Sequence, residues 1–286
     1  MYLDIPYERT CDCKKSHLSC VSAKQWVKNQ IGVWQFGYEK RDIRDKNIHP
    51  ATFPISLASR VIEQFTHKGE LVLDCFCGSG TTLLASQDLD RNAVGFDLKQ
   101  EYVDLANSRL NSSLCNTKQI AVCADARNIA DYIEPKTVKL LFTSPPYANM
   151  LNTPRKNKSA RTDKRKDEHY GEVQQYSKDD RDLGVLTPDL FLSELGNIFS
   201  AMRSVFDDKA HIVVNISDFW RKEEHTPLHI GIINTLSESG YVFRNTIIWD
   251  RRNLVNGTGI FGYPSNYITM RTSFEYILDF TVRQES

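Results

Sequence analysis

The segment Ser144-Pro145-Pro146-Tyr147 holds groups that could act on an amine without bonding to it covalently. An exocyclic amine on a base is a poor nucleophile because its lone pair is delocalised into the ring. Hydrogen-bond acceptors placed on its hydrogens favour the charge that develops when it reacts. The Ser144 hydroxyl and the Pro145 carbonyl are such acceptors, two consecutive prolines stiffen the loop, and Tyr147 offers a ring face to an unstacked base. Taken alone, the tetrapeptide is equally typical of an ordinary loop, so its position in the fold decides.

A glycine-rich turn precedes it in the chain, with the sequence Asp74-Cys75-Phe76-Cys77-Gly78-Ser79-Gly80-Thr81-Thr82. Glycines let a ligand approach the backbone closely, and the start of a helix offers free N–H groups. Asp97 ends the next apolar run, where a carboxylate can accept hydrogen bonds from ribose hydroxyls, and Asp125 could bind an adenine amino group by the same logic. The third glycine of the dinucleotide fingerprint is missing, which disfavours NAD. The alternative is a purely structural turn.

Short apolar runs alternating with amphipathic segments predict the elements that carry these loops. We expect strands at residues 71–74, 93–97, 120–124, 139–143, 211–215, 241–249 and 273–281, and helices at 81–89, 100–110, 188–206 and 227–239. Continuous apolar runs suit a parallel sheet covered on both faces. The last strand follows without an intervening helix, so we expect an α/β, doubly wound, seven-stranded sheet that is mostly parallel with an antiparallel last strand forming an edge pair. Such sheets bind ligands at the carboxyl ends of their strands, which is where both loops would lie.

At these motifs the sequence resembles the amino-group DNA methyltransferases, which act on cytosine N4 or adenine N6. Residues 74–82 resemble the family's Asp-Pro-Phe-x-Gly-Ser-Gly-Thr-Thr motif, with Cys75 in place of proline, and residues 144–147 resemble its Ser-Pro-Pro-Tyr motif. His49-Pro50-Ala51-Thr52-Phe53-Pro54 resembles the segment that, in the family, packs near the methionine part of the cofactor. The resemblance covers residues 47–147 motif by motif and residues 188–281 more loosely, in the unpermuted order.

This resemblance implies the Rossmann-like methyltransferase fold and S-adenosyl-L-methionine as cofactor. In the family, serine at the head of the catalytic motif goes mainly with cytosine N4, and aspartate mainly with adenine N6. We therefore expect a site-specific DNA methyltransferase acting on N4 of a flipped-out cytosine, with adenine N6 as the alternative and RNA less favoured. The residues expected to bind the cofactor are His49, Pro50, Phe53, Asp74, Phe76, Gly78, Ser79, Gly80, Thr81, Thr82, Asp97 and Asp125. Those expected to be catalytic are Ser144, Pro145, Pro146 and Tyr147.

Two insertions are candidates for contacts with double-stranded DNA. We expect residues 46–286 to form the catalytic domain, with DNA-contacting loops at 148–187 and 250–272, and residues 1–45 to pack on it. Residues 155–166 carry seven basic side chains and one acidic one, and phosphates attract such clusters. A solvated surface loop is the alternative for this cluster, and charges at a hairpin end are the alternative for the second loop. The candidates are Arg155, Lys156, Lys158, Arg161, Lys164, Arg165, Lys166, Arg251, Arg252 and Arg271.

Composition limits the other classes of protein. A net charge of zero argues against a uniformly basic nucleic-acid binder, although one positive face is enough for DNA. No apolar run is long enough for a transmembrane helix and no secretory signal is recognisable, so we expect a cytoplasmic protein. No segment has the size of a separate recognition domain. Sequence specificity would then come from the insertions, the N-terminal segment, a homodimer or a specificity subunit. A cognate restriction endonuclease would complete a restriction-modification system.

Seven cysteines, an odd number, indicate reduced thiols rather than a disulfide scaffold. Cys11, Cys13, His17 and Cys20 could supply four zinc ligands, but their spacing is tighter than that of common zinc motifs and no second half-site follows. We therefore expect ordinary thiols and no metal. A protein amide substrate is disfavoured because it goes with asparagine at position 144. A non-catalytic cofactor-binding or DNA-binding subunit is disfavoured because both loops are intact.

Overall fold

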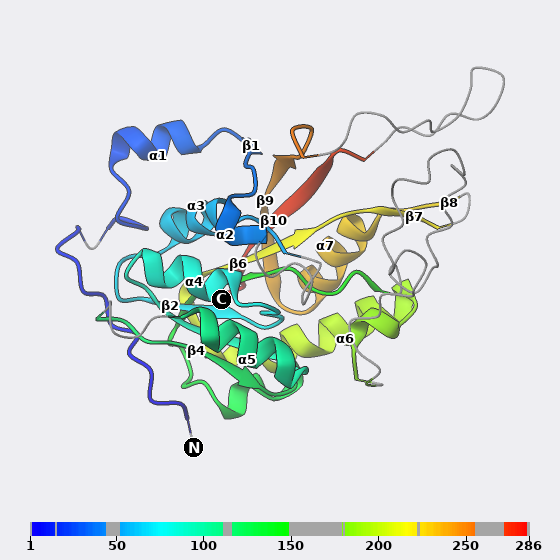
Figure 1. Cartoon of the computed structure of the whole chain (residues 1–286), viewed down its shortest axis with the longest axis horizontal. Coiled ribbons are helices and arrows are strands. Elements are labelled where there is room, and N and C mark those ends of the chain that lie inside the picture. Colours follow the sequence, from blue (N-terminus) through cyan, green and yellow to red (C-terminus); the bar gives the residue numbers. More distant parts are fainter. Residues whose placement is uncertain are drawn as a thin grey trace.

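The computed structural model describes residues 2–14, 16–43, 52–110, 116–148, 179, 181–221, 224–254 and 272–284. An eight-stranded sheet in the order β1-β9-β10-β6-β5-β2-β3-β4 forms its centre (Figure 1). The strands are β1 (Val33–Gln35), β2 (Leu71–Asp74), β3 (Asn92–Asp97), β4 (Gln119–Cys123), β5 (Val138–Thr143), β6 (Phe206–Ile216), β9 (Tyr241–Asp250) and β10 (Phe274–Val282), and β7 (Phe219–Arg221) pairs with β8 (Glu224–Thr226) in a separate hairpin.

Helices cover both faces of the sheet. They are α1 (Ala23–Asn29), α2 (Lys40–Ile43), α3 (Ile55–Phe65), α4 (Thr81–Asp88), α5 (Gln100–Arg109), α6 (Pro188–Ala201) and α7 (Leu228–Glu238), with 3-10 turns η1 (Ala126–Asp131), η3 (Leu183–Val185) and η4 (Arg203–Val205). One apolar core joins the sheet to α3, α4 and α5, and a second joins it to α6, α7 and η1. This two-sided burial explains why all four residues of β2 and five of the six residues of β5 are buried. Within the described residues, no helix combines the length and the apolar character needed to cross a bilayer.

The mostly parallel, doubly wound α/β sheet that the sequence predicts is confirmed. Strands β4, β3, β2, β5 and β6 are parallel neighbours. The last strand, β10, is antiparallel, but it lies between β9 and β6 rather than in an edge pair. The strand therefore has a partner on each side, which an antiparallel hairpin alone would not provide.

The prediction of seven strands was wrong by one, because the N-terminal segment adds β1 beside β9. Val33 pairs with Ile248 and Trp34 with Trp249, in parallel register. Trp34 is buried while its two neighbours in the strand are exposed. Three residues are too few for an alternating pattern to be recognised in the sequence. The other large difference is β6, which begins at Phe206, five residues before the apolar run, because Asp207, Asp208 and Lys209 extend the strand at the surface.

The parallel strands bring four chain turns to one edge of the sheet. β2 ends at Asp74, β3 at Asp97, β4 at Cys123 and β5 at Thr143. Because β10 runs antiparallel, its first residues, with Glu275 among them, lie at this same edge. The fold thus gathers side chains from both halves of the sequence at the carboxyl ends of its parallel strands.

Candidate active site

A cavity of about 360 Å³ opens at this edge of the sheet. The residues expected from the sequence that line it are Phe53, Phe76, Ser79, Thr81, Asp97, Asp125, Ser144, Pro145, Pro146 and Tyr147. Arg251, which was expected to contact DNA, also lines the cavity. Other residues in the lining were not expected, and those used below are Tyr38, Tyr102, Asn215, Trp249 and Glu275. The cofactor turn and the catalytic loop therefore face one common space.

The glycine turn between β2 and α4 depends on left-handed backbone conformations. Gly78 has φ +48° and Gly80 has φ +77°, which side-chain-bearing residues rarely adopt. A Cβ atom on Gly80 would lie 2.8 Å from the Cβ of Ala106 on α5. The turn is thus packed directly against a neighbouring helix, and Arg109 of that helix donates a hydrogen bond to the Ser79 carbonyl at 2.7 Å. Glycine is required here by geometry.

Asp97, at the end of β3, holds the turn and faces the cavity. Its Oδ2 accepts a hydrogen bond from the Gly78 N–H at 3.0 Å, and its Oδ1 accepts one from the Lys99 N–H at 3.0 Å. Burial raises the pKa of this carboxyl above its ordinary value, and the two backbone N–H groups oppose that rise. Each carboxylate oxygen has a second lone pair. The side chain can therefore accept further hydrogen bonds from a ligand in the cavity.

Asp74 is placed differently from the expectation that it contacts the cofactor. It is buried beside the cavity and does not line it. Its Oδ2 accepts a hydrogen bond from Thr82 Oγ1 at 2.6 Å and its Oδ1 accepts one from Thr143 Oγ1 at 2.7 Å. Gly78, Gly80 and Thr82 are also outside the lining. These four residues shape the turn from behind, because the last residue of β2 points into the protein rather than towards the cavity.

The cavity lining also contains a charged pair and a further aromatic ring. Asp125 caps the start of η1, where its carboxylate accepts hydrogen bonds from the Arg127 N–H at 3.0 Å and from the Arg127 guanidinium at 3.0 and 3.1 Å. Arg127 also binds Glu194 of α6 at 2.7 Å. Tyr102 of α5 lines the cavity with the Lys99 ammonium 4.2 Å from its ring centre. The sequence signal for this tyrosine was its place in the first turn of the helix after Asp97.

The catalytic loop is connected to the other half of the sheet. Ser144 Oγ and Tyr147 Oη are 3.3 Å apart, and Tyr147 donates a hydrogen bond to Glu275 Oε2 at 3.3 Å. The Pro146 carbonyl accepts a hydrogen bond from the Ala148 N–H at 2.9 Å, which closes a tight turn. In the described part of the chain, the Pro145 carbonyl takes no part in such a backbone bond. Ser144 and Pro145, which carry the two acceptors expected from the sequence, both line the cavity.

Glu275 is the centre of a polar network that the sequence did not predict. This buried carboxylate accepts a hydrogen bond from Asn215 Nδ2 at 2.7 Å and forms an ion pair with Arg251. The Arg251 guanidinium also lies over the Trp249 ring, 4.9 Å from its centre. The Asn215 Oδ1 is buried and has no hydrogen-bond partner among the described residues. An unpaired acceptor in the wall of a cavity is costly unless a ligand satisfies it.

The two thiols of the cofactor turn are buried, which disfavours their thiolate form. Burial raises the pKa values of Cys75 and Cys77 well above their ordinary value. A nucleophilic cysteine needs its thiolate form, which a lowered pKa supplies. Chemistry at this site therefore depends on oxygen and nitrogen groups.

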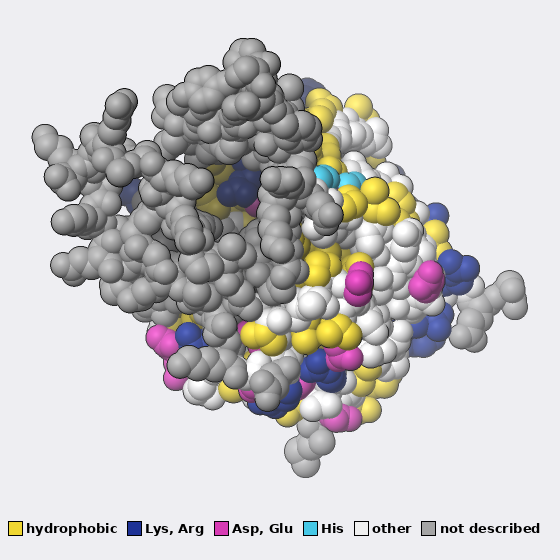
Figure 2. Space-filling view, turned by 90° about the vertical axis from the view of Figure 1, so that its right-hand side faces the viewer, with side chains coloured by type: hydrophobic (Ala, Val, Ile, Leu, Met, Phe, Trp, Pro, Cys, Tyr) yellow, Lys and Arg dark blue, Asp and Glu magenta, His cyan; other side chains and the backbone are white. Residues whose placement is uncertain are grey.

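Some of the expected site residues lie outside the described residues. They are His49 and Pro50, which were expected to bind the cofactor, and residues 155–166 and Arg271, which were expected to contact DNA. Arg251 turns into the cavity, and Arg252 binds the Asp250 carboxylate at 2.7 Å. Figure 2 shows a face on which acidic, basic and hydrophobic side chains of the described residues are intermixed. The contacts of Arg252 agree with a charge at a hairpin end, whereas Arg251 belongs to the cavity wall.

A family model described as DNA methylase matches residues 2–108 and 138–285, which is most of the chain. The chain belongs to this family. Membership of this family implies S-adenosylmethionine as the methyl donor. The cavity offers a nucleoside the Asp97 carboxylate, the Tyr102 and Phe76 rings, and Ser79 of the glycine turn.

Curated relatives match this chain over part of its length. The type II methyltransferase M1.MboII of Moraxella bovis is 35% identical over 119 residues, which are 37% of this chain and 46% of that protein. The type II methyltransferase M.MthZI of Methanothermobacter thermautotrophicus is 38% identical over 114 residues, which are 38% of this chain and 30% of that protein. The matched segments therefore span less than half of these relatives.

One solved structure supports the fold. It is a chain in the complex between the Trm112 methyltransferase activator of Haloferax volcanii and a methyltransferase, and it aligns with a TM-score of 0.53. The alignment covers 86% of this protein and 96% of the other chain at 10% identity.

Proposed function

We propose that this protein transfers a methyl group from S-adenosylmethionine to the N4 amino group of a cytosine that has been flipped out of duplex DNA. The observation that carries the proposal is the position of Ser144 and Pro145 on the wall of the same cavity as Asp97 and the glycine turn. When bound there, the sulfonium cofactor supplies an electrophilic methyl group. A base amine held by the loop would then lie within reach of it.

The chain's own contribution to the chemistry is hydrogen-bond acceptance. Ser144 Oγ and the Pro145 carbonyl would take the two amine hydrogens, which localises the nitrogen lone pair and stabilises the positive charge that develops on nitrogen. Prolines at 145 and 146 fix φ, so these acceptors are held in place before the base arrives. Preorganised acceptors of this kind act more strongly in a cavity from which water is excluded.

The network around Glu275 would hold the catalytic loop and contact the base. Tyr147 donates its hydroxyl hydrogen to Glu275, so its ring is fixed at the cavity wall, where a base can stack. Asn215 Oδ1 is an unused acceptor in the same wall. Arg251 forms an ion pair with Glu275, so the buried carboxylate charge is compensated within the network.

Cytosine N4 is preferred to adenine N6 because serine heads the motif at position 144, as in family members that act mainly on cytosine. Cytosine C5 is disfavoured by the raised pKa values of Cys75 and Cys77, since that reaction needs a thiolate. We place the reaction in a restriction-modification system because the matched relatives are named type II methyltransferases. A specificity subunit, a homodimer and a cognate endonuclease belong to this same proposal.

Nucleoside mass spectrometry on DNA from a host that expresses the protein tests the substrate. The proposal expects N4-methylcytosine in hosts with the wild-type chain and none in hosts with Ser144→Ala. N6-methyladenine alone would move the assignment to adenine. The absence of both bases, with cofactor binding demonstrated on the same protein, would overturn the proposal.

RNA is the second substrate to examine, because phosphate contacts and base stacking serve both nucleic acids. Transfer of a labelled methyl group is measured with duplex DNA in the presence of structured RNA of equal length. Labelled DNA is expected, and label that appears in the RNA instead would contradict the DNA assignment.

A further inference from the structure

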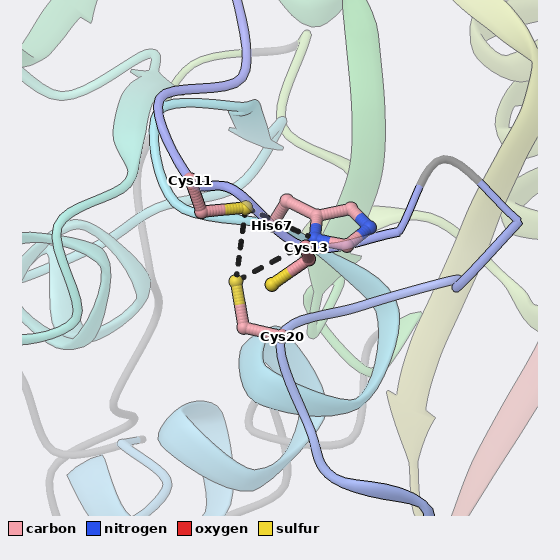
Figure 3. Close-up of side chains that lie close together, drawn as sticks. All are labelled: Cys11, Cys13, Cys20 and His67. Carbon is pink, nitrogen blue, oxygen red and sulfur yellow. Dashed lines mark hydrogen bonds between the residues drawn. The ribbon is translucent and has the colours of Figure 1, made fainter.

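Three cysteines and one histidine converge at the opposite end of β2 from the active site. Figure 3 shows Cys11, Cys13, Cys20 and His67 pointing towards one another. Their ligand atoms, three Sγ atoms and one imidazole nitrogen, all lie within 4.8 Å of one another. The cysteines are partly buried and His67 is 2% exposed. The chemistry of this cluster takes no part in the proposed methyl transfer.

Three of the six distances between the ligand atoms are close to the edges of a zinc tetrahedron. Zinc bonds of about 2.3 Å to sulfur and about 2.0–2.1 Å to nitrogen place two sulfurs about 3.8 Å apart, and a sulfur and a nitrogen about 3.6 Å apart. Cys20 Sγ lies 3.5 Å from Cys11 Sγ. His67 Nδ1 lies 3.3 Å from Cys11 Sγ and 3.5 Å from Cys20 Sγ. These three edges are shorter than the ideal values by only a few tenths of an ångström.

The orientation of the His67 ring suits a metal ligand. His67 Nε2 lies 2.9 Å from the backbone carbonyl of His17. A carbonyl can only accept, so Nε2 carries the proton and the Nδ1 lone pair faces the thiols. Metal-bound histidines commonly donate their second ring N–H to a carbonyl in this way, because it fixes the ring orientation.

The surroundings also suit a site with three thiolates. One zinc ion and three thiolates carry a net charge of −1. The Arg9 guanidinium lies beside the cluster, with Nη1 3.4 Å from His67 Nε2, and donates a hydrogen bond to the Cys13 carbonyl. The Lys68 N–H donates a hydrogen bond to Cys20 Sγ at 3.4 Å. A cation and an N–H···S bond both stabilise a cysteine sulfur in its anionic form.

We propose that Cys11, Cys13, Cys20 and His67 bind a structural zinc ion that attaches the N-terminal segment to the catalytic domain. Four protein ligands leave no open position for a substrate or a reactive water, which is the mark of a structural site. His67 stands between α3 and β2, and the three cysteines precede α1. Beyond α1, the same segment supplies β1 and Tyr38, which lines the cavity.

From the sequence we expected these cysteines to be ordinary thiols, in part because no second half-site follows them in the chain. His67 is that missing ligand, 47 residues after Cys20 in the chain. His17, which was the candidate in the sequence, contributes its backbone carbonyl instead. A disulfide is a poor alternative, because the Cys11 and Cys20 sulfurs are 3.5 Å apart, whereas a disulfide bond is about 2.05 Å long.

Metal content of the purified full chain is the primary test. Protein produced with zinc in the medium and purified in a reducing buffer is expected to carry one zinc per chain by inductively coupled plasma mass spectrometry. Cys20→Ser and His67→Gln are expected to lose it, whereas Cys123→Ser, which removes an exposed thiol outside the cluster, should keep it. Wild-type protein with less than a tenth of an equivalent would overturn the proposal, as would full zinc content in the first two variants.

Cobalt substitution tests the ligand set even where a variant folds poorly. Wild-type protein loaded with Co²⁺ is expected to show the intense d–d bands of a tetrahedral site and a thiolate charge-transfer band. His67→Cys should keep one metal per chain, with a spectrum changed towards four thiolates. An octahedral cobalt spectrum in the wild type, or a Cys11–Cys20 disulfide found by mass spectrometry of fresh, alkylated protein, would contradict the site. Chelation of zinc is expected to lower the thermal midpoint and to expose the N-terminal segment to protease.

Discussion

Thr143 Oγ1 donates a hydrogen bond to Asp74 Oδ1 at 2.7 Å, so the last residues of two neighbouring strands are bound side chain to side chain. Ser144 follows Thr143 directly, and Thr82 of α4 donates to the other Asp74 oxygen at 2.6 Å. One buried carboxylate therefore fixes the catalytic loop relative to the cofactor turn. Asp74 acts as a positioning residue, since it reaches the site through its two threonine partners.

Asp74 predicts a pH dependence of stability. Burial raises the pKa of this carboxyl from 3.8 to about 6, so the folded protein binds its proton more tightly than the unfolded chain does. The resulting stability is fully present below about pH 4 and is lost as pH rises through about 6, by up to about 3 kcal/mol. Urea unfolding between pH 4 and pH 7.5 measures this loss. In Asp74→Asn the loss should disappear, and parallel pH curves for the two proteins would contradict this assignment.

Ser144→Ala should reduce turnover and leave cofactor binding unchanged. The variant removes one preorganised acceptor for the amine, and such groups contribute about 10²-fold to 10³-fold to kcat. Its neighbours at the turn, Asp97 and Gly78, are not altered. Single-turnover methyl transfer and calorimetric titration with S-adenosylmethionine separate the two effects. Equal losses in rate and affinity would show that Ser144 serves binding instead.

Asp97→Ala should produce the opposite pattern. Its carboxylate binds the Gly78 and Lys99 N–H groups and faces the cavity, so its removal loosens the turn and takes away an acceptor for the ligand. Hydrogen bonds to a charged group contribute about 1.5–3 kcal/mol, which is roughly a tenfold to hundredfold loss of cofactor affinity. Calorimetry gives the dissociation constant. Asp97→Asn keeps one acceptor oxygen, so its cofactor affinity should lie between those of the wild type and Asp97→Ala. An unchanged affinity in Asp97→Ala would argue against a role of Asp97 in cofactor binding.

Glu275 should act on the reaction through Tyr147. Glu275→Gln keeps the shape of the side chain but removes the charge that pairs with Arg251 and weakens the acceptor for the tyrosine hydroxyl. We expect kcat to fall about tenfold, with cofactor affinity unchanged. The kcat of the double variant with Tyr147→Phe should fall by less than the product of the two single reductions, because both changes remove the same hydrogen bond. Independent, multiplicative losses would separate Glu275 from the tyrosine.

Local signals in the sequence were enough to predict the two loops and most of the sheet. The apolar run of β2, the glycines of the turn and the prolines after β5 each specify their conformation within a few residues. The orientation of Asp74 was not predictable in this way, although it and Asp97 both end parallel strands. Which of two strand-end carboxylates faces the cavity depends on the neighbours that the folded sheet provides.

Contacts between distant parts of the chain account for what the sequence did not reveal. Asn215 and Glu275 meet because β10 inserts antiparallel beside β6, and no local pattern encodes that register. His67 joins the N-terminal cysteines in the same manner, across the start of the sheet. In both cases a polar residue with an ordinary local sequence acquires its partners only through the topology.

Gly80→Ala tests whether the turn requires a left-handed residue. Alanine at φ +77° costs about 1–2 kcal/mol, and its Cβ would lie 2.8 Å from the rigid Cβ of Ala106, so α4 or α5 must shift. We expect the free energy of unfolding to fall by at least that amount and cofactor affinity to fall with it. Gly32→Ala is the matched control, because its nearest neighbour would be 3.8 Å away and its φ is not left-handed. In denaturant unfolding, the stability of Gly32→Ala should stay within about 0.5 kcal/mol of wild type. Equal stability losses in the two variants would mean that position 80 does not require a left-handed residue.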